Sequence, residues 1–385
     1  MSWGEAWREA WRNILSDSAA ALALLGAALL YSFYYPVAYR HQVATQLPIA
    51  VVDEDHSALS REIVRSAQAV RAVRVVATPL DLRRAAALLE AGEVDGILLI
   101  PRGLGHDVLR GEQGHLLLHG NAAYLIRNAA LLGGLGEMAG GAIAELAERR
   151  AAALGIAGPA VLKATQPVKL VTRPLYNTRD GYGSYVVPAV AVLIAQQVLM
   201  IGAALIVCGV ARGRGWSAMR LGAHALAFWL IGMLTLAYFL GFVFWFQDYP
   251  RGGNALGALV AVPLFMTACV GLAMWLGSIM PNRARTMQVL TLTSVPFFFL
   301  SGTSWPHVLM PEPLVWVARL IPTTPGIQAM LKLNQMGASL AEVLPELLNL
   351  AALALLFWGL ALHRLRAEPV EPALDGPALD GPAAG

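Results

Sequence analysis

Long apolar runs without charged residues dominate the second half of the chain. Four of them lack Asp, Glu, Lys and Arg altogether: Tyr185–Val210, Leu221–Gln247, Asn254–Met280 and Thr286–Met310. A fifth run, Leu347–Leu362, is shorter, but Leu340–Leu344 extends it across Pro345–Glu346. A helix needs about 20 apolar residues to cross the hydrocarbon core of a bilayer. Five such runs in close succession predict a five-helix membrane core over residues 184–366.

The composition agrees with a membrane protein. Hydrophobic residues make up 57% of the 385 residues and charged residues only 14%, whereas soluble domains average about 25% charged residues. Cys208 and Cys269 lie inside predicted spans, which predicts small packing residues and excludes a disulfide framework outside the membrane. The formal net charge of +3 says little about partners, and nothing in the chain indicates a nucleic acid.

The first 40 residues predict a surface helix followed by a span. In residues 1–17, apolar and polar side chains separate onto two faces at helical spacing. The apolar face holds Trp3, Trp7, Ala10, Trp11 and Ile14, and the polar face holds Glu5, Arg8, Glu9 and Arg12. Tryptophans beside a polar face suit the membrane interface, so this helix either anchors the chain there or also contacts a cytosolic partner. Residues 18–40, with the apolar run Ser18–Tyr39, predict the first span, an uncleaved anchor rather than a signal peptide.

Residues 41–183 differ from the rest of the chain, because charges return and short runs alternate between strand and helix periods. Strands are predicted at Pro48–Val52, Val73–Val76, Gly96–Ile100 and His115–Leu118, with a returning strand at Val168–Val171. Helices are predicted at Ser57–Val70, after an N-cap at Thr78, and from a cap at Asn121 to about Leu154. The pattern predicts a small α/β domain inserted between the first and second spans.

Two motifs in this domain have both a chemical and a structural interpretation. Asp53-Glu54-Asp55-His56 has metal-ligand residue types, but acids in a strand-to-helix loop also suit the positive end of the next helix. Gly134-Leu135-Gly136 with Gly140-Gly141 is glycine-rich like a nucleotide loop, but no strand precedes it. We expect a structural role for both motifs and no metal site in this chain.

The arginines predict the orientation of the spans, because short cytosolic loops carry an excess of Lys and Arg. With six spans, the arginine-bearing ends fall on one side: Arg8 and Arg12, then Arg212, Arg214 and Arg220, then Arg283 and Arg285, then Arg364 and Arg366. Both termini are therefore predicted to be cytosolic and residues 41–183 extracytoplasmic. Residues 367–385 are rich in Pro, Ala, Gly and Asp, which predicts a disordered cytosolic tail.

The spans offer no obvious energy source. Ion-coupled transporters usually keep an ionisable group inside the membrane, and here only His224 comes near, one turn into its span. An interfacial packing role is the simpler interpretation of this histidine. The chain also lacks a Gly-x-x-x-x-Gly-Lys-Ser/Thr phosphate loop. Uphill transport would therefore take its energy from another subunit.

Several motifs stand at the ends of the predicted spans and after the first strand. They are Leu300-Ser301-Gly302 before Pro306, Met310-Pro311, Leu320-Ile321-Pro322-Thr323-Thr324-Pro325, Val51-Val52-Asp53-Glu54-Asp55 and Tyr182-Gly183-Ser184-Tyr185-Val186-Val187-Pro188. Together with the span pattern, they resemble the ABC-2 type permeases of bacterial multidrug exporters, in the subfamily with a periplasmic domain after the first span. The resemblance covers all but the tail, although Thr303-Ser304 stands where other members place bulky apolar residues.

The resemblance implies an α-helical multi-pass protein of the bacterial inner membrane that exports amphipathic, drug- or lipid-like cargo. Two permease copies, or one copy and a sibling, would sit on cytosolic ABC ATPase subunits that hold ATP and Mg. This chain would then be no enzyme and have no cofactor or catalytic residue. Membrane lipids and a periplasmic adaptor are further implied partners. The ATPase-contacting residues would come from the N-terminal helix and the loop between spans two and three: Trp7, Trp11, Arg212, Arg214, Trp216 and Arg220.

The resemblance also implies that spans two and five face each other across the dimer axis. Their polar and aromatic side chains suit a path for amphipathic cargo: Gln196, Gln197 and Met200 in span two, and Thr291, Thr293, Ser294, Phe297 and Phe298 in span five. Ordinary hydrogen bonding and packing between helices is the alternative for each residue. Two other functions stay open, a receptor for extracytoplasmic ligands and a scaffold of a secretion machine. Co-purification with an ATPase would distinguish the exporter from a scaffold.

Overall fold

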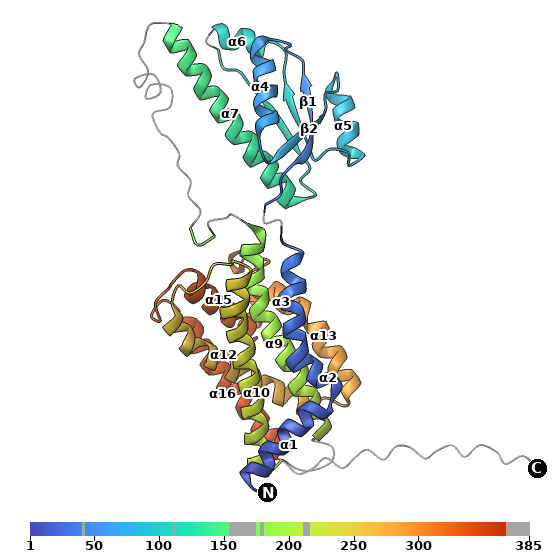
Figure 1. Ribbon diagram of the computed structural model, residues 1–385, viewed down its shortest axis with the longest axis vertical. Helices are drawn as coiled ribbons and strands as arrows, with labels where there is room; N and C mark the ends of the chain where they lie inside the picture. Colours follow the sequence, from blue (N-terminus) through green and yellow to red (C-terminus); the bar gives the residue numbers. More distant parts are fainter. Residues whose placement is uncertain (41–42, 111, 154–174, 178–180, 211–215, 367–385) are drawn as a thin grey trace, which may run out of the picture. The chain divides into compact units, whose positions relative to one another are not determined.

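The structure, a computed structural model, describes residues 1–40, 43–110, 112–153, 175–177, 181–210 and 216–366. They belong to two compact units, Met1–Arg40 with Pro174–Gly385 and His41–Arg173 (Figure 1). The first unit is helical, and the second contains a β-sheet. Four predicted features lie outside the described residues: Arg212, Arg214, the strand Val168–Val171 and the tail 367–385.

The helical unit begins with an amphipathic helix and a first long helix. α1 (Trp3–Ser16) starts at a capping box, in which the Ser2 hydroxyl and the Glu5 carboxylate each accept the other residue's backbone N–H. Hydrogen bonding to Ser2 lowers the pKa of Glu5. Asp17 ends α1 and caps a continuous helix made of α2 (Ser18–Ala21), η1 (Leu22–Gly26) and α3 (Ala27–Val37). This continuous helix is the predicted first span.

The remaining elements of the helical unit follow residue 181. They are α9 (Tyr182–Val210), α10 (Ala218–Tyr238), η2 (Phe239–Val243), α11 (Phe244–Phe246), α12 (Ala255–Ile279), α13 (Arg283–Leu300), η3 (His307–Leu309), α14 (Glu312–Arg319), α15 (Thr323–Met330), η4 (Leu331–Gln335) and α16 (Leu344–Arg366). In the described part of the chain, five helices are long and apolar enough to cross a membrane: Ser18–Val37, Tyr182–Val210, Ala218–Phe246, Ala255–Ile279 and Leu344–Arg366. They confirm the multi-pass membrane architecture.

The predicted span Thr286–Met310 is only partly helical. α13 has 18 residues, and its two arginines and Gln288 make it more polar than the five helices above. It ends at the Ser301 cap because Gly302 adopts a left-handed backbone with φ +81°, a conformation that glycine takes without strain. The chain therefore turns near Gly302, ahead of the short η3. A sixth span would have to be α13 itself, which is shorter than predicted.

α9 is the centre of the helical unit. The first long helix, α10, α12, α13 and α15 all pack on it, and nearly every side chain from Gly183 to Cys208 is buried. Small residues allow these close approaches, since Leu24 of η1 lies over Gly202 and Gly277 of α12 faces the backbone of Ala204. As a result, α9 has almost no surface left for lipid.

The second unit is a four-stranded sheet with helices on both faces. Its elements are β1 (Leu47–Asp53), α4 (Ala58–Ala69), β2 (Val73–Ala77), α5 (Leu82–Glu90), β3 (Gly96–Ile100), α6 (Leu104–Arg110), β4 (Leu117–Gly120) and α7 (Leu125–Ala153). The strand order is β2-β1-β3-β4, with β4 antiparallel to β3 and the other pairs parallel. Side chains of α4 and α7 share one core with the sheet, and those of α5 share the core of the opposite face.

Two predicted helix starts in this unit are shifted. Asp81 rather than Thr78 caps α5, because its carboxylate accepts from the Arg84 N–H at 2.8 Å. Asn121 lies in a turn, where its side-chain oxygen accepts from the Ala123 N–H at 3.1 Å, and α7 begins at Leu125. The segment before α5 offers two capping residues, Thr78 and Asp81, and spacing alone does not decide which one the chain uses. Before α7, the Asn121 carbonyl oxygen also accepts from the Tyr124 N–H, so the chain makes a turn before the helix begins.

Candidate functional site

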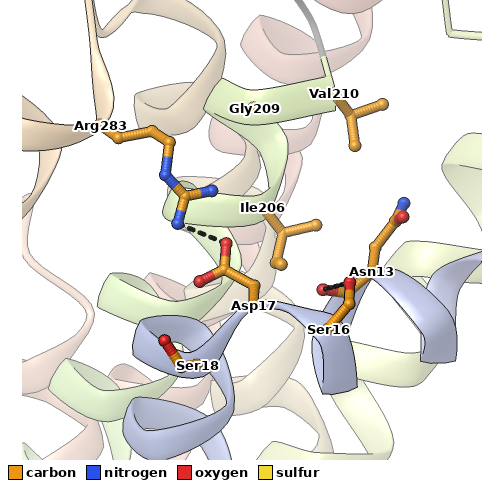
Figure 2. Close-up of a pocket in the computed structure, with 8 residues that line it drawn as sticks. All are labelled: Asn13, Ser16, Asp17, Ser18, Ile206, Gly209, Val210 and Arg283. Carbon is orange, nitrogen blue, oxygen red and sulfur yellow. Dashed lines mark hydrogen bonds and ion pairs between the residues drawn. The ribbon is translucent and has the colours of Figure 1, made fainter.

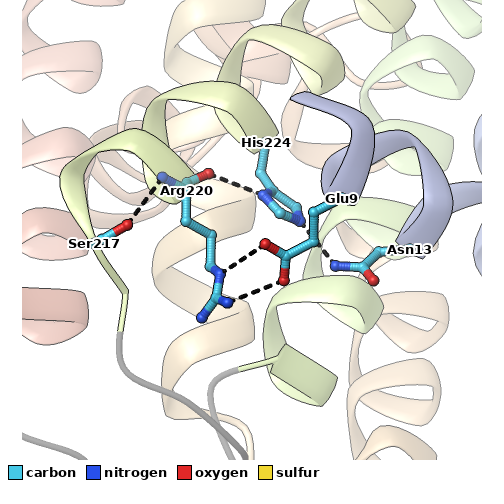
Figure 3. A network of polar contacts seen from close by, with 5 residues as sticks. All are labelled: Glu9, Asn13, Ser217, Arg220 and His224. Atoms are coloured by element: carbon cyan, nitrogen blue, oxygen red, sulfur yellow. Dashed lines mark hydrogen bonds and ion pairs between the residues drawn. The ribbon is translucent and has the colours of Figure 1, made fainter. Parts of the chain in front are cut away.

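A buried ion pair joins α1 to the start of α10. Arg220 places its Nη2 3.1 Å from one oxygen of Glu9 and donates from Nε to the other at 3.2 Å (Figure 3). The arginine side chain is 8% exposed and the glutamate side chain 25%. Of the four residues predicted on the polar face of α1, Glu9 is the one that is only partly exposed, and it pairs with α10. A buried guanidinium needs a counter-charge, and Glu9 turns toward α10 to supply it.

A second set of polar contacts lies beside this ion pair. His224 has its Nδ1 2.9 Å from the Arg220 carbonyl oxygen, so Nδ1 carries the proton, and Nε2 accepts from the Asn13 amide at 3.1 Å. The ring of Trp216 meets the imidazole edge to face at 5.2 Å. We call these residues the α1–α10 junction: Glu9, Asn13, Trp216, Arg220 and His224. With both nitrogens engaged, the buried His224 is a structural part of this junction.

The corner between α1 and α2 carries a second ion pair. One oxygen of Asp17 accepts from the Ala20 N–H at 3.1 Å, which caps α2, and the other oxygen pairs with Arg283 at the start of α13 (Figure 2). A pocket of about 510 Å³ opens here. Its lining residues are Asn13, Ser16, Asp17, Ser18, Ile206, Gly209, Val210 and Arg283. The lining of the pocket thus comes from the corner between α1 and α2, from the end of α9 and from the start of α13.

Four of the predicted ATPase-contacting residues lie in the described part of the chain, and all four pack within the helical unit. Trp7 and Trp11 are half-buried, 5.9 Å apart in an edge-to-face pair, and pack on the helical core. Trp216 and Arg220 are buried in the junction. Sequence reasoning missed Asn13, Asp17 and Arg283. The signal in the sequence is that Asp17 and Arg283 are charged residues that each precede an apolar run. Helical periodicity cannot show that two residues so far apart in the chain form an ion pair.

The structure separates the predicted path residues into a buried layer and a more exposed one. Gln196 accepts from the Cys269 thiol of α12 at 3.5 Å, and Gln197 donates to the Leu290 carbonyl oxygen of α13 at 3.1 Å. Both glutamines and Met200 are buried within their own chain. On α13, Thr291 is exposed, and four residues are half-buried: Thr293, Ser294, Phe297 and Phe298. That these residues line a cargo path stays a prediction.

In the second unit, the carboxylates of the acidic motif accept hydrogen bonds from backbone N–H groups of the same unit. Asp55 accepts from the Gly103 and Gly105 N–H groups at 2.9 and 3.0 Å. These contacts lie where β1 and β3 end, the strand-order switch point at which α/β folds of this kind commonly bind ligands. Asp53 accepts from the His56 N–H at 3.0 Å and the Ser60 hydroxyl at 2.8 Å. These acids therefore stabilise the loop that follows β1.

The glycine-rich motif of α7 is helical throughout. Gly134 lies so close to the turn between α4 and β2 that an added Cβ would meet the Cβ of Ala72 at 2.8 Å. Around Gly136, Gly140 and Gly141, no neighbouring atom of the described residues lies within 4 Å of such a Cβ. One of the glycines is therefore required for close packing, as expected of a structural motif.

Comparison with known families adds one finding. The family model described as "ABC-2 family transporter protein" matches residues 20–363. The match runs from the first turn of the first long helix to His363 in the last turn of α16, and it includes the whole second unit. No curated protein matches the chain.

Proposed function

The chain belongs to the ABC-2 transporter family, and from that premise we propose that it is the permease subunit of an ATP-driven exporter of amphipathic, drug- or lipid-like cargo. The family makes it the membrane component of an ABC transporter, which associates with an ABC ATPase subunit. The observation that carries the proposal is the match over residues 20–363, together with five helices able to cross a membrane. ATP and Mg would be held by the ATPase, and this chain would supply the path.

The packing of α1 supports a role as the ATPase contact. Ala6, Ala10 and Ile14 bury one face of α1 in the helical unit, and the α1–α10 junction ties that face to α10. The opposite face leaves Glu5, Arg8 and Arg12 exposed. An ATPase that binds this exposed face would therefore act on α1 and α10 together.

The outer face of α13 supports a second permease copy. It exposes a band of large apolar residues: Met287, Val289, Leu292, Val295 and Phe299. Gln288 and Thr291 are exposed among them, and polar side chains at membrane depth favour a protein or cavity neighbour over lipid. We infer that a second copy or a sibling permease covers this face, with Thr291 and Ser294 on the cargo route and the two glutamines in the layer behind.

The second unit would lie outside the cytoplasm, and the protein would lie in a bacterial inner membrane. The arginine distribution supports this sidedness. Arg220 and Arg283 lie at the same end of the helical unit as α1, since both pair with its acidic residues. A sheet unit outside the membrane would be the part available to a periplasmic adaptor.

Purification of the tagged chain from its native membrane tests the proposal. We expect an ABC ATPase subunit to co-purify and to hydrolyse ATP in the complex. Arg8→Glu with Arg12→Glu should lower ATPase recovery at least about tenfold, because reversed charges at an interface cost several kcal/mol. Glu312→Lys, a charge reversal on an exposed residue of α14, is the matched control. Recovery of other membrane proteins without an ATPase would instead support a scaffold.

A further inference from the structure

Asp17 joins three elements through one carboxylate. It ends α1, it caps α2 through the Ala20 N–H, and it pairs with Arg283, the first residue of α13. The aspartate side chain is 13% exposed and the arginine side chain 46%. The carboxylate therefore sits where the amphipathic helix, the first long helix and α13 meet (Figure 2).

The pocket beside this ion pair is poorly suited to a ligand, because most of its polar side chains already have partners within the protein. Asn13 is engaged with His224, and the Ser16 hydroxyl donates to the Asn13 carbonyl oxygen at 3.5 Å. Asp17 is engaged with Ala20 and Arg283. The arrangement is that of a joint between helices.

Arg283 also lies close to the end of α9. A Cβ added to Gly209 would lie 3.3 Å from a guanidinium nitrogen of Arg283, so the cation lies against the last turn of α9. The C-terminal end of a helix carries partial negative charge and favours a cation. Glycine at position 209 leaves room for this contact.

In the described chain, α13 packs mainly on α9, α14 and α15, whereas α1 packs on α10 and α2. The α1–α2 corner and α13 thus share little packed surface beyond the Asp17–Arg283 pair. A tilt of α1 can displace α10 through the Glu9–Arg220 ion pair, and it can displace the start of α13 through the Asp17–Arg283 ion pair. α13 is also the helix that exposes the predicted path residue Thr291.

We propose that Asp17 and Arg283 are positioning residues that transmit a movement of α1 to α13 and so couple the ATPase to the transport path. The inference rests on the proposed function, in which the ATPase binds α1. It adds the contact through which binding at one end would move the helix on the cargo side.

The test uses the full chain with its co-purified ATPase and the variants Asp17→Asn, Arg283→Gln and both together. Asparagine is as good a helix cap as aspartate, so Asp17→Asn removes the charge and keeps the cap on α2. Arg285→Gln, at an exposed arginine two residues along the same helix, is the matched control. Arg283→Lys keeps the charge and should retain most of the coupling.

Amide hydrogen exchange with and without ATP and vanadate gives a readout that needs no known cargo. In the unchanged protein, we expect nucleotide to alter exchange both in α1 and in the first turn of α13. In Asp17→Asn and Arg283→Gln, the α1 response should persist, and the α13 response should fall at least about fivefold, the low end of coupling between sites. The double variant should be no worse than either single variant, because both remove one interaction.

Persistence of the α13 response in both single variants would overturn the inference and leave the proposed function standing. The inference would also be overturned if the α13 response in the double variant fell by the product of the two single fold-changes, since the two residues would then act independently. If the unchanged chain recovers no ATPase, both the proposed function and this inference fail.

Discussion

Gln196 and Gln197 are adjacent on α9 and serve different neighbours. Neighbouring residues on a helix point about 100° apart, and the two side chains reach α12 and α13 respectively. The Nε2 of Gln196 and the Oε1 of Gln197 are buried with no hydrogen-bond partner among the described residues. A buried polar atom left unpaired costs about 1–3 kcal/mol of folding free energy. Packing alone would therefore favour an apolar residue over glutamine at both positions.

Gln197→Leu should change the free energy of unfolding by no more than about 1 kcal/mol, because one hydrogen bond and one unpaired oxygen disappear together. The Leu290 carbonyl oxygen keeps the Thr293 hydroxyl as a donor at 2.7 Å. If the glutamines shape the cargo route from the layer behind it, the range of exported compounds should change more than ATP turnover does. Leu205→Met, a volume-conserving change on the same helix, is the control. A large drop in thermal midpoint with unchanged export would indicate a packing role instead.

Close contact between α9 and α12 can be tested with two glycines. A Cβ on Gly277 would lie 2.8 Å from the Ala204 carbonyl oxygen and 2.8 Å from the Val207 Cβ. Backbone atoms cannot rotate away, so Gly277→Ala should lower the free energy of unfolding by about 1–3 kcal/mol. A Cβ on Gly359 of α16 would have no neighbouring atom of the described residues within 4 Å, so Gly359→Ala should be neutral or stabilising by up to about 1 kcal/mol. Equal thermal midpoints for the two variants would contradict this packing.

Elements were more predictable than their ends and their long-range partners. Strands such as Gly96–Ile100 were found because a short run of branched apolar residues is bounded by turn residues, and β3 has the same limits. The far end of α13 was missed because the apolar run continues through Met310, while one backbone angle at Gly302 stops the helix. The pairing of Glu9 was missed because Arg220, its partner, lies 211 residues away.

At the scale of the whole molecule, sidedness stays a prediction that labelling can check. We expect Arg12→Cys on α1 and Ala69→Cys in the second unit, both at exposed positions, to react oppositely with an impermeant thiol reagent. In intact cells with a permeable outer membrane, only the position in the second unit should be labelled. Cys208 and Cys269 are buried and should remain silent. Labelling of the α1 position from outside would invert the proposed orientation.

The burial of α9 also has a consequence for synthesis on the ribosome. The helices α10, α12, α13 and α15, which cover it, are all translated after it. When α9 first enters the bilayer, the partners of Gln196 and Gln197 do not yet exist, and an unsatisfied polar group in lipid costs several kcal/mol. The nascent chain must therefore keep Gln196 and Gln197 without these partners until residues 269 and 290 have been made.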